Sequence, residues 1–184
     1  MSLAAVPRRE HWRTWTVWGL GLYVIGAVVF LALGGGRSGS SPLPGTDAAS
    51  LGPVHLIEYD TLDGGSATLA DQAGRPLVIN FFASTCAPCR EEMPDFETFH
   101  QNFGNEIAVV GLAVEGARPA RTIIEETGVT FETGLDQRDI MIDLGGFGLP
   151  TTVFVDPVGN VVETHTGLLT YEALLAKVQE HFGT

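Results

Sequence analysis

The stretch FFASTCAPCR, residues 81–90, contains both cysteines of the chain, Cys86 and Cys89, with two residues between them. It follows an apolar run typical of a strand and precedes a run typical of a helix. Two thiols at this spacing can close a disulfide across one helical turn, and the first can lie where helix N–H groups stabilise a thiolate. The pattern predicts thiol–disulfide exchange, with Cys86 as the attacking nucleophile and Cys89 as the thiol that resolves the mixed disulfide.

The composition limits the class of protein. A chain of 184 residues that is 45% hydrophobic and 17% charged has room for one domain with a real core and an appendage. The formal net charge is -12, and residues 37–184 are more acidic still, because the first 36 residues carry three arginines against one glutamate. Such an acidic body argues against nucleic acid as a partner.

The two cysteines leave no thiol for a framework of structural disulfides. A Cys-x-x-Cys pair could instead be half of a zinc site, but a tetrahedral site needs two further ligands. The remaining candidates are five scattered histidines without metal-ligand spacing: His11, His55, His100, His165 and His181. We therefore expect neither a metal nor another cofactor.

Residues 15–33 (WTVWGLGLYVIGAVVFLAL) are nineteen residues of apolar sequence inside a stretch without charges. A helix of this length spans about 28 Å, close to the roughly 30 Å hydrocarbon core of a bilayer. Tryptophans and arginines gather at its N-terminal end, which predicts a cytoplasmic N-terminus and an extracytoplasmic domain in the cell membrane. We expect residues 1–36 to form a cytoplasmic tail and a retained single-pass anchor, with a cleavable signal peptide as the main alternative.

Residues 37–53 are rich in small and polar residues and are expected to form a flexible linker, so residues 54–184 form the folded domain. Its expected strands are residues 54–59, 77–82, 107–114, 129–131, 152–155 and 161–166. Its expected helices are residues 89–104, with a kink at Pro94, then 119–127, 139–144 and 171–182. Residues 66–76 are expected to be a connector. This order predicts an α/β fold with a central mixed sheet and helices on both faces.

Three fragments carry a family resemblance: NFFAS at residues 80–84, CAPCREEMP at 86–94 and GLPTTVFVD at 148–156. In this order and spacing, residues 54–184 resemble the membrane-anchored TlpA/ResA/DsbE-like branch of the thioredoxin superfamily. The resemblance implies a thioredoxin-like fold and a thiol–disulfide oxidoreductase activity. We also expect the protein to be a monomer.

The resemblance also implies further site residues. Pro150 is expected to follow a cis peptide bond from Leu149 and to lie against the disulfide. The thioredoxin pattern has a buried acid where this chain has Asn80, so another group must handle protons. Glu115, at the end of a predicted strand, and Glu92, which matches the family pattern Arg-x-Glu-x-Pro, are the candidates. For each of them, an ordinary solvated carboxylate is the alternative.

Thr85 stands where most relatives have tryptophan, so an apolar cover over the disulfide is missing. The leading hypothesis is an extracytoplasmic oxidoreductase that exchanges disulfides with partner proteins. The family suggests that it acts as a reductant, for example of apocytochrome c, with electrons from a membrane thiol–disulfide carrier. The alternative is a thioredoxin-fold binding or assembly factor whose cysteine pair is only a structural disulfide.

Overall fold

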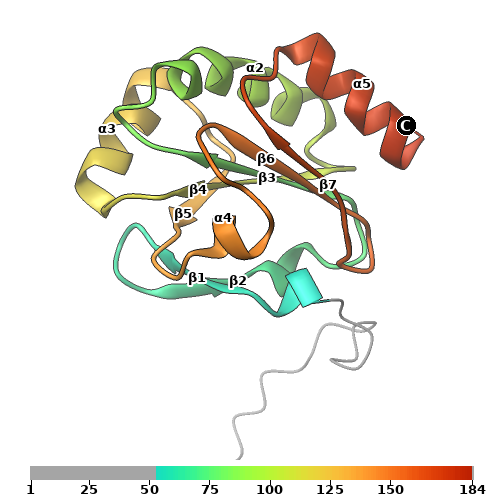
Figure 1. Cartoon of the computed structure of the whole chain (residues 1–184), viewed down its shortest axis with the longest axis horizontal. Coiled ribbons are helices and arrows are strands. Elements are labelled where there is room, and N and C mark those ends of the chain that lie inside the picture. The colour runs from blue at the N-terminus through green and yellow to red at the C-terminus, as the bar shows by residue number, and fades with distance from the viewer. Residues whose placement is uncertain (1–52, 184) are drawn as a thin grey trace, which may run out of the picture. The chain divides into compact units, whose positions relative to one another are not determined.

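The computed structural model describes residues 53–183 of the chain. The predicted anchor and residues 37–52 of the predicted linker lie outside these residues, whereas Pro53, predicted as the last linker residue, begins the helix η2 (Pro53–Leu56). Within residues 53–183, no helix is both long and apolar enough to cross a membrane. The described residues form a seven-stranded sheet with helices packed on both of its faces (Figure 1).

The sheet is mixed, as the order of elements predicts. Its strands are β1 (Glu58–Thr61), β2 (Ser66–Thr68), β3 (Leu77–Phe82), β4 (Ala108–Ala113), β5 (Glu132–Leu135), β6 (Thr151–Val155) and β7 (Val161–Thr166). They lie in the order β2-β1-β5-β4-β3-β6-β7. β3, β4 and β5 run parallel, whereas β6 is antiparallel to β3, β7 to β6, and β1 to both β5 and β2.

The two faces of the sheet carry different helices. One face is covered by α2 (Ala87–Phe103), α3 (Ala117–Thr127) and α5 (Tyr171–Phe182), whose buried side chains share one hydrophobic cluster. The other face is covered by the short α4 (Ile140–Asp143) and the 3-10 helices η2 (Pro53–Leu56) and η3 (Leu69–Gln72). Because both faces are covered, every residue of β3 and β4 is buried.

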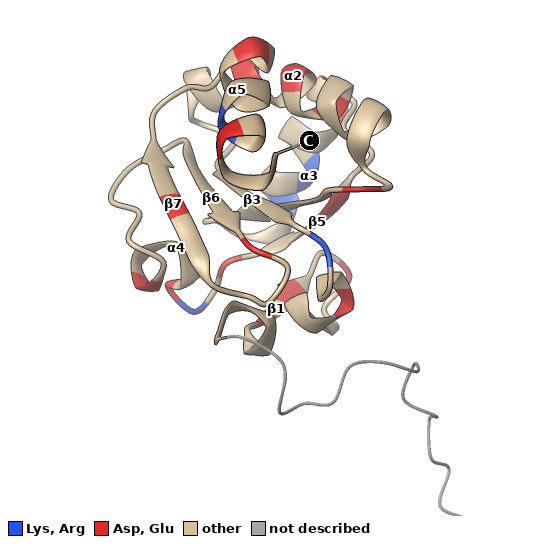
Figure 2. Ribbon diagram, turned by 90° about the vertical axis from the view of Figure 1, so that its right-hand side faces the viewer, with Lys and Arg blue, Asp and Glu red and all other residues tan. Residues whose placement is uncertain are grey.

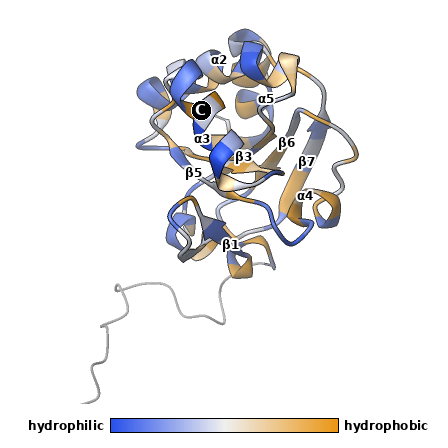
Figure 3. Ribbon diagram, turned by 90° about the vertical axis from the view of Figure 1, so that its left-hand side faces the viewer, coloured by the Kyte–Doolittle hydropathy of each residue, from blue (hydrophilic) through white to orange (hydrophobic). Residues whose placement is uncertain are grey.

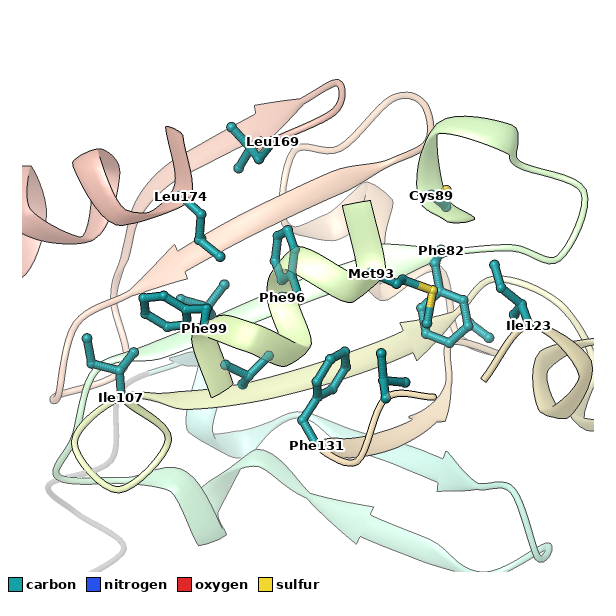
Figure 4. Close-up of a cluster of buried hydrophobic side chains, with 14 of the residues drawn as sticks. Phe82, Cys89, Met93, Phe96, Phe99, Ile107, Ile123, Phe131, Leu169 and Leu174 are labelled. Atoms are coloured by element: carbon teal, nitrogen blue, oxygen red, sulfur yellow. The ribbon is translucent and has the colours of Figure 1, made fainter. Parts of the chain in front are cut away.

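Helix α2 is held to the sheet by the apolar stripe that its spacing of three and four residues predicts. Met93, Phe96 and Phe99 are fully buried, and they point from α2 onto the sheet (Figure 4). The helix continues through Pro94 to Phe103. This packing fixes the position of the first turn of α2, where both cysteines lie. Charged residues remain on the outer surfaces of the helices and on the turns, and acidic ones predominate (Figure 2).

The predicted thioredoxin-like order of elements is confirmed, but three segments differ. Residues 54–56 belong to η2 rather than to the first strand, and residues 66–68, expected in a connector, form β2. The strand expected at residues 129–131 instead starts at Glu132. Val129 and Phe131 are buried at 7% and 3% exposure without strand pairing. Their apolar character marks burial in the core, which coil residues can also provide.

An ion cluster joins the last helix to the edge strand of the sheet. Glu163 of β7 accepts hydrogen bonds from Lys177 Nζ at 2.5 Å and pairs with His181 Nε2 at 2.6 Å, both from α5. Burial alone would raise the pKa of Glu163, but the hydrogen bonds and charges of Lys177 and His181 outweigh it and hold that pKa below its usual value. The ionised Glu163 therefore stabilises the docking of α5.

We predict that Glu163→Gln lowers the free energy of unfolding at pH 7 by about 1–2 kcal/mol. Since the folded pKa of Glu163 is depressed, its contribution is complete above the ordinary value of 4.5 and disappears as the pH falls through the folded pKa. Urea unfolding of wild type and variant from pH 7 to pH 3.5 should show the two stabilities converging. Glu180→Gln, on the exposed face of α5, is the matched control and should change stability by less than about 0.5 kcal/mol. An equal loss at every pH would contradict the assignment.

Candidate active site

Both cysteines lie in the first turn of α2 and form a disulfide. Cys86 is the N-cap residue, and the backbone N–H of Cys89 points at its Sγ at 3.1 Å. Cys86 is partly exposed, whereas Cys89 is fully buried above Phe82 and Met93 (Figure 4). A partner can therefore reach only the first sulfur, and once the disulfide is reduced the helix N-terminus stabilises that sulfur as a thiolate. These are the properties that the spacing predicts for a nucleophile and a resolving thiol.

In the loop that leads into the disulfide, the backbone N–H, the hydroxyl and the carbonyl of Ser84 each form a hydrogen bond. Glu115, just beyond the end of β4, accepts a hydrogen bond from Ser84 N at 2.5 Å and another from Ser84 Oγ at 3.0 Å. Arg90 Nη2 donates to the carbonyl of Ser84 at 2.9 Å and also pairs with Glu126 of α3. Glu115 thus lies close to the site, as expected from its place after a strand. Its two oxygens fix the backbone two residues before Cys86.

Glu92 is a buried carboxyl one turn beyond Cys89. Only 1% of the residue is exposed, so the solvated alternative is wrong for this glutamate. Its Oε1 accepts from Asn80 Nδ2 at 2.7 Å, and its Oε2 accepts from the backbone N–H of Leu169 at 3.0 Å. This chain has Asn80 on β3 where the thioredoxin pattern has a buried acid. Glu92 of α2 instead places a buried carboxyl in direct contact with Asn80.

Burial raises the pKa of Glu92 to about 7, although hydrogen bonds from Leu169 and Asn80 lower it, and nearby Asp95 contributes to the rise. Asn80 Oδ1 is buried and has no hydrogen-bond partner within residues 53–183. An amide can donate to a carboxylate through its nitrogen or accept from a carboxylic acid through its oxygen. Asn80 can therefore stabilise either protonation state of Glu92, which suits a group that exchanges a proton near neutral pH.

The loop between β7 and α5 is the part of the site that sequence reasoning missed. It is tied to α2 twice, by Leu169 N donating to Glu92 and by Tyr171 N donating to Asp95 at 2.9 Å. Its partners are backbone N–H groups, which every residue other than proline carries. No side-chain motif could have revealed these contacts; the only signal was a pair of acids three positions apart on α2, Glu92 and Asp95.

The Leu149–Pro150 peptide bond is cis, as the resemblance implies. Pro150 is buried, and its carbonyl accepts from Gly167 N at 2.9 Å. The following residue, Thr151, pairs with Phe81 on β3. The start of β6 therefore lies at the same edge of the sheet as the end of β3, from which the cysteine loop leaves. Leu149 and Cys86 both pack against the cluster beneath α2.

The site consists of a redox-capable sulfur pair, a buried acid and a proline loop. Among residues 53–183, no group of three or more His, Cys, Asp or Glu side chains is placed to hold a metal ion. Thr85 is exposed at the tip of the cysteine loop and provides no apolar cover. The chemistry that the described site supports is the exchange of electrons between this disulfide and the thiols of another molecule.

Comparisons with known proteins agree with this chemistry. The model of the AhpC/TSA family matches residues 53–164. The thioredoxin-like protein YneN of Bacillus subtilis is 30% identical over 122 residues, which cover 64% of this chain and 72% of YneN. The thiol-disulfide oxidoreductase ResA of Halalkalibacterium halodurans is 31% identical over 121 residues, with coverages of 64% and 68%.

The fold has a solved counterpart as well. The crystal structure of a DsbF homologue from Corynebacterium diphtheriae matches with a TM-score of 0.61 at 25% identity, covering 76% of this chain and 96% of that one. The family match spans more than half of the chain, and the sulfur pair lies at the N-terminus of α2 inside it. The chain therefore belongs to the AhpC/TSA family and is a thioredoxin-like thiol–disulfide oxidoreductase of the ResA/DsbE type.

Proposed function

We propose that this oxidoreductase works outside the cytoplasm, tethered to the membrane through residues 15–33, and reduces disulfides in partner proteins. Apocytochrome c is one candidate partner, and a membrane thiol–disulfide carrier is the proposed source of electrons. The observation that carries the proposal is the unequal exposure of the two sulfurs at the N-terminus of α2. Cys86, which is partly exposed, can attack a partner disulfide, and the buried Cys89 can resolve the mixed disulfide.

The reaction has two exchange steps. The Cys86 thiolate attacks a disulfide sulfur of the partner; a Cys86–partner bond forms, the partner disulfide breaks, and the departing partner thiolate takes a proton. The Cys89 thiolate then attacks Cys86 Sγ, re-forms the disulfide and releases the second partner thiol. Two electrons pass to the partner, and the carrier returns them by the same exchange in reverse.

We assign proton handling at the second step to Glu92. Cys89 and Glu92 are three residues apart on α2, so they are neighbours on one face of the helix. A carboxylate with a pKa near 7 can accept the Cys89 proton when that thiol attacks and can return it when the disulfide is reduced again. Glu115 is the second candidate, and its hydrogen bonds to Ser84 give it a positioning role in the same cycle.

The direction of electron flow can be tested through the potential of the Cys86–Cys89 couple. Equilibration of the full chain with glutathione redox buffers, read by mass spectrometry of alkylated thiols, should give a strongly reducing value. A value near the roughly -120 mV of DsbA would instead identify an oxidant. Such a value would overturn the reductant assignment and leave the exchange activity intact.

The partner proteins can be captured as mixed disulfides. We predict that Cys89→Ser, expressed in cells as the full chain, accumulates covalent adducts through Cys86, because the resolving thiol is missing. Cys86→Ser is the matched control and should capture nothing. The captured proteins should be extracytoplasmic. In intact cells, a thiol reagent that does not cross membranes should also label Cys86 once its disulfide is reduced. Failure to capture any partner, or capture of cytoplasmic proteins alone, would contradict the proposed function.

A role for Glu92 in proton transfer predicts a distinct pH profile. For the wild type, the rate of reduction of a small disulfide should rise through a midpoint near pH 7, where Glu92 loses its proton. Glu92→Gln should abolish this rise and slow turnover at pH 7.5 by about ten- to a hundred-fold. The rate of the variant should then rise only at higher pH, where the Cys89 thiol loses its proton to water.

Two variants serve as comparisons for Glu92→Gln. Glu91→Gln makes the same charge change at an exposed position of α2 and should keep the wild-type profile. Glu115→Gln should slow the reaction but retain the inflection near pH 7 if its role is to position Ser84. If the inflection near pH 7 is lost in Glu115→Gln and kept in Glu92→Gln, then Glu115 and not Glu92 is the residue that transfers the proton.

A further inference from the structure

Phe147 is the most exposed large hydrophobic side chain within residues 53–183, with 84% of its surface accessible. It lies in the loop between α4 and β6, three residues before the cis-proline. The same loop follows a hydrophobic stretch along α4 (Figure 3), where Ile142 is also 55% exposed. An aromatic ring in this position contributes nothing to the two hydrophobic clusters of the core. Its exposure therefore needs a reason other than folding.

The loop that leads to Phe147 is held by backbone hydrogen bonds and close packing. Before the ring, Gly145 N donates to Ile142 O at 3.0 Å and Gly146 N donates to Met141 O at 2.8 Å. Gly146 is packed so closely that an added Cβ would lie 2.7 Å from the Met141 side chain. The backbone at Phe147 is therefore held in place, and little backbone entropy is lost when a partner covers the ring.

The far side of the loop is anchored to the edge strand. Thr151 Oγ1 donates to Gly148 O at 2.7 Å and lies 3.1 Å from Thr166 Oγ1 on β7. Thr164 Oγ1, also on β7, donates to Leu144 O at 2.7 Å. These bonds hold the loop to the sheet on both sides of the exposed ring.

The ring lies close to the redox site. Phe147 and Pro150 are three positions apart in the chain, so their Cα atoms are at most about 11 Å apart. Leu149, between them, packs against the same cluster as Cys86, and neither its backbone N–H nor its C=O enters a backbone hydrogen bond within residues 53–183. Thr151, which follows the cis-proline, pairs with Phe81 at the end of β3, from which the cysteine loop leaves. A polypeptide that binds at Cys86 and extends along the proline loop would therefore meet the backbone of Leu149 and the ring of Phe147.

We propose that Phe147 is a specificity-determining residue that binds a large apolar side chain of an extended partner polypeptide, within about three residues of the partner's reactive cysteine. This proposal deepens the proposed function and rests on it. The partner's sulfur reacts at Cys86, its backbone lies along Leu149, and its apolar side chain covers the Phe147 ring. Thr85, the exposed residue immediately before Cys86, offers no comparable apolar surface, so the preference is set by the proline loop.

The full chain is first reduced with dithiothreitol, which is then removed, so that the Cys86 and Cys89 thiols supply the two electrons. The test measures disulfide reduction in a single turnover with three substrates: oxidised glutathione, a peptide disulfide with leucine two residues from its cysteine, and the same peptide with serine in place of leucine. The wild type should reduce the leucine peptide faster than the serine peptide. Phe147→Ala should slow the leucine peptide by roughly five- to twenty-fold, the equivalent of partly uncovering one aromatic side chain. The rates with glutathione and with the serine peptide should stay within about two-fold of wild type.

Leu56→Ala is the control for exposed apolar surface. Leu56 is 61% exposed in η2, and its neighbour Val54 bonds to Gly159 at the turn that follows β6, the end of the sheet away from the cysteines. This variant should leave all three rates unchanged. Thermal unfolding of Phe147→Ala should match that of the wild type, because the ring is exposed.

The possible outcomes separate this inference from the proposed function. Equal reduction of the two peptides by the wild type, or an equal loss on all three substrates in Phe147→Ala, overturns the role of Phe147 while the oxidoreductase assignment stands. A wild type that reduces none of the three substrates overturns the proposed reductant function itself. Retention of the leucine preference in Phe147→Leu, but not in Phe147→Ser, would support an apolar contact.

Discussion

The burial of the apolar face of α2 against β3 and β4 is the constraint on which the site depends. Met93, Phe96 and Phe99 are fully buried, so the helix cannot shift along the sheet without opening cavities in a close-packed core. The first turn of the helix is placed by the same contacts. That turn exposes Cys86, hides Cys89 and aims a backbone N–H at the sulfur, so redox chemistry follows from ordinary core packing.

The same helix also carries a group that the core would not ordinarily accept. Glu92 is buried as deeply as its apolar neighbours, and its burial is possible because Asn80 and Leu169 N provide hydrogen bonds. A buried carboxyl that retains two hydrogen bonds can exist in either protonation state, and its pKa of about 7 reflects this balance. Solvated glutamates such as Glu91, one residue earlier, have no such environment.

Much of the fold could be predicted because the strongest signals are local. The continuous apolar run at residues 77–82 and the helical spacing after Cys89 predict β3 and α2 with nearly correct bounds. Predictions failed at the margins of the sheet, where β2 has only three residues and Phe131 is buried without pairing. In such segments the partner strand decides the conformation, and local hydrophobicity cannot identify that partner.

The sequence by itself determined the chemistry of this protein. Two cysteines at a strand-to-helix junction predict a redox disulfide, since reactive groups are visible as residue types. The proline loop at Gly-Leu-Pro-Thr-Thr, about sixty residues later, followed from the family resemblance that these residues carry. Only the tertiary structure decided which groups surround the sulfurs: Asn80 meets Glu92, Ser84 meets Glu115, and Phe147 is left exposed on an anchored loop. The two contacts join residues that are far apart in the chain, and the exposure of Phe147 depends on how the whole domain packs. No local sequence pattern can therefore predict them.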